Sequence, residues 1–243
     1  MPDPTYKRIV WDKDGERLYE TGVDHVVLFV KNSAYDPDTP GSKAYLPGVA
    51  WNGVTAINER PSGGEASPLW ADNMKYLNLR ANEDFGLTLE AYTYPDEFAE
   101  CDGSTFAGST GVKLGQQPRK PFGLCYRTKI GNDVEGVQHG YKLHLVYGCD
   151  AAPSEKSHQT INDSPEAITF SWEFSTTPAI VSGFQAVAHI EIDSTKFTAS
   201  QMKAIEDKLY GVDTTTGTDA NAGAESYLPL PDEVLSTMGY VAA

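Results

Sequence analysis

The sequence predicts a mainly β protein, folded as one domain with one well-defined helix. Three observations support this: short runs of alternating apolar and polar residues, frequent turn residues between them (22 Gly and 15 Pro), and one segment with helical periodicity. A chain of 243 residues is long enough for one large β domain with a substantial core. There is no internal repeat and no convincing domain boundary, so residues 1–243 are expected to form a single domain.

Two hairpins and one buried strand are expected near the start of the chain. Asp14-Gly15 is placed to turn a hairpin over residues 6–20, and Asn52-Gly53 a second one over residues 49–59. HVVLFV (25–30) is apolar on both faces, which is typical of a strand buried between layers or within an oligomer.

Residues 61–84 show no clear strand pattern, and we interpret them as a long loop. A loop of this length inside a compact domain usually serves an interaction. It carries apolar bulk that would be costly to leave exposed in a monomer, so it is predicted to contact another subunit. The residues concerned are Leu69, Trp70, Met74, Tyr76 and Leu77.

Strands resume in residues 85–94, 120–130, 140–149, 167–177 and 186–193. Two of them alternate most clearly, so each should have one dry face and one wet face. The dry faces are expected to carry Phe85, Leu87, Leu89, Ala91, Ile168, Phe170, Trp172 and Phe174. The wet faces are expected to carry Thr88, Glu90, Tyr92, Tyr94, Thr169, Ser171, Glu173 and Ser175.

The segment 197–211 is the one clear helix. Thr198 is a suitable N-cap, Gln201 completes a capping box, and Gly211 is placed to end the helix. The helix would pack on a sheet through a stripe made of Met202, Ile205 and Leu209.

The C-terminal extension (212–243) is expected to be a polar connector followed by one short element. Pro231 is suited to the first turn of a helix there, Asp232 and Glu233 favour its N-terminal dipole, and Gly239 would stop it.

The net charge of −15 and the pI near 4.6 disfavour adhesion to phosphate backbones and anionic membranes. No basic segment followed by an apolar stretch opens the chain, and no run of about 18 apolar residues occurs. We therefore expect no membrane insertion and a protein that is made and kept in a cytoplasm.

An acidic cluster follows the strand at 85–94. Glu90, Asp96, Glu97, Glu100 and Asp102 lie close together with no Lys or Arg between them. Carboxylates at this density usually bind a metal ion, perform acid/base chemistry, or repel a neighbouring negatively charged group.

Metal and cofactor sites are not indicated. Cys101, Cys125 and Cys149 are an odd, widely spaced set that we interpret as reduced structural thiols. His139 and His144 lie five apart on one strand and so point to opposite faces. The remaining histidines, His25, His158 and His189, are isolated in sequence.

One enzymatic alternative is a β-sandwich glycoside hydrolase or carbohydrate-binding module. Glu90 and Glu173 lie on the wet faces of two strands, and a retaining enzyme needs two carboxyls about 5–5.5 Å apart. Against this, Trp172 alternates onto the face opposite Glu173, where it cannot stack on a sugar beside that carboxylate.

Long blocks of the sequence resemble the major tail tube protein of long, non-contractile (siphovirus-type) bacteriophage tails. The blocks are PGVAWNGVTAINERPSGGEASPLWADNMKYLNLRANEDFGLTLEAYTYPDEFAECDGS (47–104), GQQPRKPFGLCYRTKIGNDVEGVQHGYKLHLVYG (115–148), INDSPEAITFSWEFSTTP (161–178), FTASQMKAIEDKLYG (197–211) and LPLPDEV (228–234). Blocks of this length are far more specific than a short catalytic motif.

The resemblance implies a structural virion protein without enzymatic activity. Its fold would be an antiparallel β-sandwich with one flanking α-helix, and six copies would form a ring with a shared inner β-barrel. Stacked rings would make a hollow conduit for double-stranded DNA in the phage tail, assembled in the cytoplasm of the host bacterium. An alternative with the same fold is the inner tube of a contractile tail or injection device.

The partners implied are further copies of the chain, a tape-measure protein, and tail terminator and distal tail proteins. DNA would pass without specific binding, because carboxylates on the channel wall discourage phosphate from adhering. The candidate lumen-facing residues are Thr88, Glu90, Tyr92, Thr169, Ser171, Glu173 and Ser175. The acids Asp96, Glu97, Glu100 and Asp102 are expected in a loop that contacts the next ring, together with the apolar residues of 61–84.

Overall fold

The structure is a computed structural model that describes residue 11 and residues 13–108, 110–161, 163, 167–213 and 223–240. The larger strands are β1 (Tyr19–Val30), β3 (Val54–Glu59), β5 (Ala66–Ala71), β6 (Met74–Arg80), β8 (Gly86–Ala91), β11 (Phe122–Asn132), β12 (Gly136–Ala151), β13 (Phe170–Thr176) and β14 (His189–Asp193). The short strands are β2 (Val49–Ala50), β4 (Ser62–Gly63), β7 (Glu83–Asp84), β9 (Ser104–Phe106) and β10 (Lys113–Gly115). The α-helices are α1 (Ala199–Tyr210) and α2 (Pro231–Thr237), and 3₁₀ helices cover Asp96–Glu100 and Ser194–Lys196.

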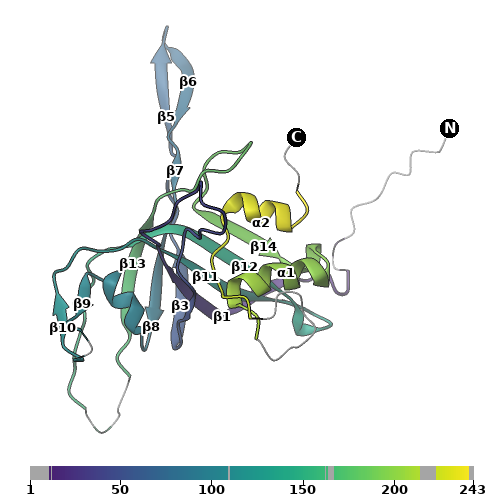
Figure 1. The fold of residues 1–243 in the computed structure, drawn as a ribbon. Coiled ribbons are helices and arrows are strands. Elements are labelled where there is room, and N and C mark those ends of the chain that lie inside the picture. Colours follow the sequence, from purple (N-terminus) through teal and green to yellow (C-terminus); the bar gives the residue numbers. More distant parts are fainter. Residues whose placement is uncertain are drawn as a thin grey trace.

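An eight-stranded antiparallel sheet forms the body of the molecule. Its order is β2-β1-β11-β12-β13-β8-β3, and β14 pairs with β12 beside that path. Figure 1 shows both α-helices on one side of the sheet and the β5–β6 hairpin projecting away from the body. The prediction of a mainly β fold is confirmed.

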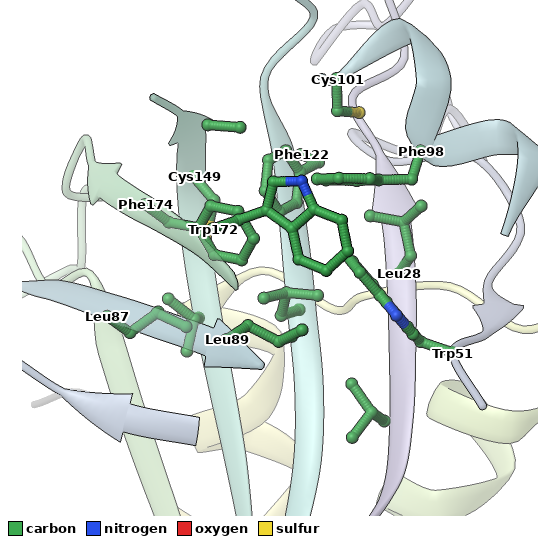
Figure 2. Close-up of a cluster of buried hydrophobic side chains, with 14 of the residues drawn as sticks. Leu28, Trp51, Leu87, Leu89, Phe98, Cys101, Phe122, Cys149, Trp172 and Phe174 are labelled. Carbon is green, nitrogen blue, oxygen red and sulfur yellow. The ribbon is translucent and has the colours of Figure 1, made fainter. Parts of the chain in front are cut away.

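The first hydrophobic cluster lies between the two halves of this sheet. Side chains of β1, β11 and β12 meet side chains of β8 and β13 around the fully buried Trp172. The Trp172 ring centroid lies 5.5 Å from that of Trp51 and 5.4 Å from that of Phe98. Figure 2 shows these three side chains together in the cluster. The structure therefore differs from the expected sandwich in one respect. The two layers belong to one continuous sheet, because β13 pairs with both β12 and β8.

The second hydrophobic cluster lies on the other face of β1, β11 and β12, under the helices. Helix α1 contributes Met202, Ile205 and Leu209, the stripe that the sequence predicts. Alternate residues of β1 enter different clusters: Val26, Leu28 and Val30 belong to the first, and Val27 and Phe29 to the second. The prediction that residues 25–30 are buried on both faces is thus confirmed for residues 26–30, whereas His25 is exposed.

Helix α1 begins and ends where local chemistry dictates. The Thr198 hydroxyl accepts a hydrogen bond from the Gln201 backbone N–H, and the Gln201 side chain accepts one from the Thr198 backbone N–H. Gly211 follows with φ of 76°, a conformation that glycine adopts at low cost.

The C-terminal segment adds a second α-helix, so the expectation of one flanking helix is corrected. Helix α2 starts at Pro231, as predicted, and Val234 is buried in the second cluster with Leu228. Pro at the first helical position leaves no hydrogen bond unmade, and the apolar side chains then anchor the helix on the sheet. Neither described helix is long and apolar enough to cross a membrane.

The two predicted hairpins are not found as such. Gly15 does occupy a turn, with φ of 83°, but residues 6–10 of the first hairpin lie outside the described residues. Gly53 also turns the chain, yet β2 pairs with β1 whereas β3 pairs with β8. The cause is Trp51, whose ring is buried in the first cluster and whose Nε1 donates to the Thr93 carbonyl at 2.9 Å. Between β2 and β3 the chain therefore passes from one end of the sheet to the other.

The three cysteines are buried free thiols, in agreement with the structural role expected for them. Burial raises the pKa of Cys101 and Cys125 to about 12 and that of Cys149 further still.

Candidate assembly surfaces

Residues 62–84 form a projecting two-stranded structure, which we call the arm (Figure 1). Strands β4 and β7 pair at its base, and β5 and β6 pair out to a two-residue turn. Asp72 and Asn73 occupy that turn with φ of 51° and 62°, a left-handed conformation that these residue types tolerate. The prediction of a loop over 61–84 is therefore wrong, because most of the segment is a hairpin.

One face of the arm is apolar. Residues directly opposite each other in an antiparallel pair share a face, and the pairs here are Ser67 with Leu79, Leu69 with Leu77, and Ala71 with Met74. We call these six residues the apolar arm face. The large side chains remain open to solvent, from 38% exposed for Leu77 to 62% for Met74.

The predicted contact residues of the arm divide between its two faces. Leu69, Met74 and Leu77 belong to the apolar arm face, whereas Trp70 pairs with Lys75 on the opposite face. Tyr76 lies at the register shift between the two strands and is 68% exposed. Leu79 belongs to the same apolar face and was missed, because its partner Ser67 could not be assigned without recognising the hairpin.

The outward side of β3, β8 and β13 is polar. Glu90 lies opposite Ser171 and Ala56, and Thr88 lies opposite Glu173 and Asn58. We define the polar sheet face as Asn58, Thr88, Glu90, Ser171, Glu173 and Ser175. The neighbours expected on the dry side, Leu87, Leu89, Trp172 and Phe174, are buried, so the predicted alternation is confirmed.

Ion pairing reduces the negative charge of this face. Arg60, which follows β3, places Nη1 2.6 Å from Glu173 Oε1, and both side chains are largely exposed. Among the described residues no cation pairs with Glu90. The acidic character that the sequence suggests is therefore carried mainly by Glu90.

Two candidate lumen residues lie just beyond the strand ends. Tyr92 follows β8 and is 53% exposed, and Thr169 precedes β13 and is exposed as well. Tyr94, expected on the wet face, instead turns inward, and its ring lies edge-on to Trp172 with 5.5 Å between centroids. The strand ends at Ala91, so alternation no longer applies at Tyr94.

The acidic segment forms the 3₁₀ helix Asp96–Glu100, where a loop was expected. Glu100 Oε2 lies 2.6 Å from Lys120 Nζ, and the Asp102 carboxylate, whose side chain is 7% exposed, pairs with Lys156 and lies 3.9 Å from Arg119. Asp96 and Glu97 are exposed. The cations come from distant parts of the sequence, so the cluster is less negative than its local composition indicates.

The two carboxylates of the glycoside hydrolase alternative lie on one face but not directly opposite each other. Glu90 opposes Ser171 and Glu173 opposes Thr88, a diagonal relation in which the two residues lie about 7–8 Å apart, with their Cβ atoms somewhat closer. Trp172 is fully buried on the far side, as the alternation predicts, and Glu173 is paired with Arg60. The arrangement offers no exposed tryptophan beside Glu173 for sugar stacking.

The structure brings together two histidines that are far apart in sequence. Because β14 pairs with β12, His189 and His144 become neighbours, and Glu59 at the end of β3 joins them. His139 lies elsewhere and contacts Asn132 and Glu135. No local signal marks the cluster, because it depends on strand pairing over 45 residues.

Comparisons with known proteins identify no family for this chain. No protein-family model matches the sequence, and no curated protein sequence matches it. Among solved structures, the chain is similar to one in the six-fold symmetrised cryo-EM structure of the anti-feeding prophage (AFP) baseplate, with 9% identity and a TM-score of 0.34. That similarity covers 76% of this chain and 97% of the other.

Proposed function

We propose that the chain is a structural subunit of a phage-tail-like tube, in which copies of the chain contact each other through the arm. The observation that carries the proposal is the apolar arm face, a set of large side chains that the fold holds in solvent. The resemblance of residues 47–104 to tail tube proteins supports the same assignment, since this block contains the whole arm.

Burial of the apolar arm face against another copy would be strongly favourable. Burial of apolar surface contributes about 25 cal/mol per Å², and a leucine or methionine side chain that goes from fully exposed to fully buried gains about 1.5–3 kcal/mol. The large side chains of the apolar arm face are 38–62% exposed, so each would gain a part of this. Exposed apolar patches of this kind usually mark interaction sites. A hairpin that projects from the body, as in Figure 1, reaches a neighbouring copy without distorting the sheet.

The end of the main sheet offers a second contact. Strand β3 is the last strand of the path and pairs with β8 on one side. Unpaired strand edges recruit further strands. In a ring, this edge would join the sheet of one copy to that of the next, which is the shared inner barrel that the resemblance implies.

In the finer form of the proposal, the ring is a hexamer and the tube conducts double-stranded DNA. The polar sheet face would then line the bore, with Ser171, Ser175 and Glu90 toward the nucleic acid. Such a wall offers little for phosphate to pair with. The inner tube of a contractile tail or injection device would use the same surfaces without this cargo.

The test is a pair of double variants in the arm. Leu69→Ser with Leu77→Ser polarises the apolar arm face, and Lys75→Ser with Asn78→Ser changes the opposite face to a matched extent. We expect rings or tubes of wild type and of the second variant in negative-stain images, and unassembled subunits of the first.

The circular dichroism and melting temperature of the unassembled subunits should be close to those of wild type, because the side chains replaced belong to neither hydrophobic cluster. Tubes formed equally well by both variants would overturn the role of the arm. A wild-type chain that stays monomeric at all concentrations would contradict the proposal that it is a tube subunit.

A further inference from the structure

Three potential metal ligands meet at the root of the arm. Glu59 is the last residue of β3, His144 lies within β12, and His189 begins β14. Glu59 stands three residues before the arm, and Phe85, which follows the arm directly, stacks on the His189 ring with 4.8 Å between centroids.

The spacing of the three ligand atoms fits a single small cation. His144 Nδ1 lies 3.2 Å from His189 Nε2 and 3.5 Å from Glu59 Oε1, and His189 Nε2 lies 4.0 Å from the same oxygen. Tetrahedral Zn²⁺ with bonds of about 2.0–2.1 Å requires its ligand atoms to lie about 3.4 Å apart. The three atoms therefore approximate three corners of a tetrahedron.

Outer hydrogen bonds hold two of the ligands in a binding orientation. Thr128 Oγ1 lies 3.0 Å from His144 Nε2, so a proton on Nε2 donated to that hydroxyl leaves the Nδ1 lone pair facing the cluster. The Tyr126 hydroxyl donates to Glu59 Oε1 at 2.7 Å, and the Tyr126 ring stacks on His144. Both contacts are of the kind that fix metal ligands in known sites.

The surroundings favour neutral imidazoles. Burial lowers the pKa of both His144 and His189, against the opposing influence of Glu59 and Glu191. Lys142, near the pair on β12, is engaged by Glu20 and Glu191. A neutral histidine is the form that binds a metal.

The cluster is open on one side. His189 lines a cleft together with Asn82, Phe85 and residues 185–188, whereas His144 is 4% exposed and closes the other side. The Glu59 side chain is 39% exposed, so a metal ion can approach the cluster from solvent beside this carboxylate, and a water molecule can occupy the fourth position.

We propose that Glu59, His144 and His189 bind one divalent transition-metal ion, of which Zn²⁺ is the best match, and so tie the root of the arm to the main sheet. The ligand set of two histidines and one carboxylate is the type that Zn²⁺ accepts. This inference does not depend on the proposed assembly, since all three ligands belong to one chain.

The test uses the full-length chain without a polyhistidine tag. Zn²⁺ binding is measured by calorimetry, and Co²⁺ is used as a probe because its visible absorption bands report tetrahedral coordination. We expect one site per chain in the wild type, and at least a tenfold weaker affinity in His189→Ala and in Glu59→Gln, which keeps an acceptor for Tyr126. The matched control, His158→Ala, replaces an exposed histidine away from the cluster and should bind as the wild type does.

Thr128 positions the His144 ring and does not itself bind the metal, so its role is tested by a separate pair of variants. Thr128→Val should weaken Zn²⁺ binding about 10- to 100-fold, and Thr128→Ser should restore it, while the melting temperature of the metal-free chain changes equally little in both. If the wild type binds no Zn²⁺ or Co²⁺, or if His158→Ala loses binding as His189→Ala does, the inference is wrong. The cluster is then only a hydrogen-bonded histidine pair.

Discussion

At the scale of single residues, Trp172 is the largest of the fully buried side chains in the described part of the chain. It is fully buried, and its ring lies within 6 Å of the rings of Trp51, Phe98, Tyr94 and Phe170. Its indole Nε1 is buried without a hydrogen-bond partner among the described residues. The contribution is therefore one of packing, since the polar atom adds nothing favourable.

Replacement of Trp172 by alanine should lower the free energy of unfolding by about 3–5 kcal/mol, because a large cavity remains. Trp172→Phe should lose clearly less, since it keeps an aromatic ring and removes the unpartnered N–H. Urea unfolding followed by circular dichroism measures both. Equal losses in the two variants would show that the ring is not the main contribution.

Asp24 links stability to pH. Its carboxylate accepts hydrogen bonds from Arg127 Nε at 2.7 Å and Nη2 at 3.0 Å. Chiefly through Arg127, and with help from His25 against burial, the pKa of Asp24 is lowered in the folded chain. The stabilisation is then fully present above the unfolded value, near pH 4, and is lost as the pH falls through the lower folded value.

Asp24→Asn should therefore be less stable than wild type at pH 7, and the difference should shrink below about pH 4. Unfolding in urea at a series of pH values measures it. A difference that stays constant down to pH 2 would contradict the assignment to this carboxylate.

At the scale of elements, helix α1 could be predicted from the sequence and the arm could not. The start, end and buried stripe of α1 follow from Thr198, Gln201, Gly211 and neighbours within a few residues, so they were predicted correctly. The arm was not recognised as strands, since every residue of β5 and β6 is exposed and no buried face imposes alternation. The cluster of His144 and His189 depends on β12–β14 pairing, which no local pattern encodes.

The N-cap of α1 gives a direct test of this local control. Thr198→Ala should lower the free energy of unfolding by about 1 kcal/mol, because the first turn loses a hydrogen-bond acceptor. Thr198→Ser keeps the hydroxyl and should be close to wild type. If the alanine and serine variants unfold at the same urea concentration, the capping box does not stabilise the helix.

At the scale of the whole molecule, charge and shape have separate roles. The chain carries a net charge of −15, yet Glu173, Glu100 and Asp102 are each paired with a cation within the chain. The negative surface potential therefore depends on the positions of acidic side chains that are not neutralised by a nearby cation. Among the described residues, Glu90 on the polar sheet face has no cation partner and lies opposite Ser171, so a bore lined by this face, as proposed above, would offer little for phosphate to pair with.

If the polar sheet face lines the bore as proposed, a lysine on this face should make the bore bind DNA. In assembled tubes, Ser171→Lys places a cation beside Glu90, and we expect double-stranded DNA to be retained at low salt and released as salt rises. Ser236→Lys, on helix α2 at the other side of the molecule, is the control. Equal DNA retention by the two variants, in a sedimentation assay, would contradict the placement of this face at the bore.

The location of the three thiols has a consequence for the response of the chain to oxidising conditions. Each sulfur lies inside the packed core and remains protonated at neutral pH, so neither alkylating reagents nor peroxide meet a thiolate on the native subunit. The covalent connectivity of the chain is then the same in reducing and in oxidising media, and copies that assemble as proposed would not be joined by disulfides.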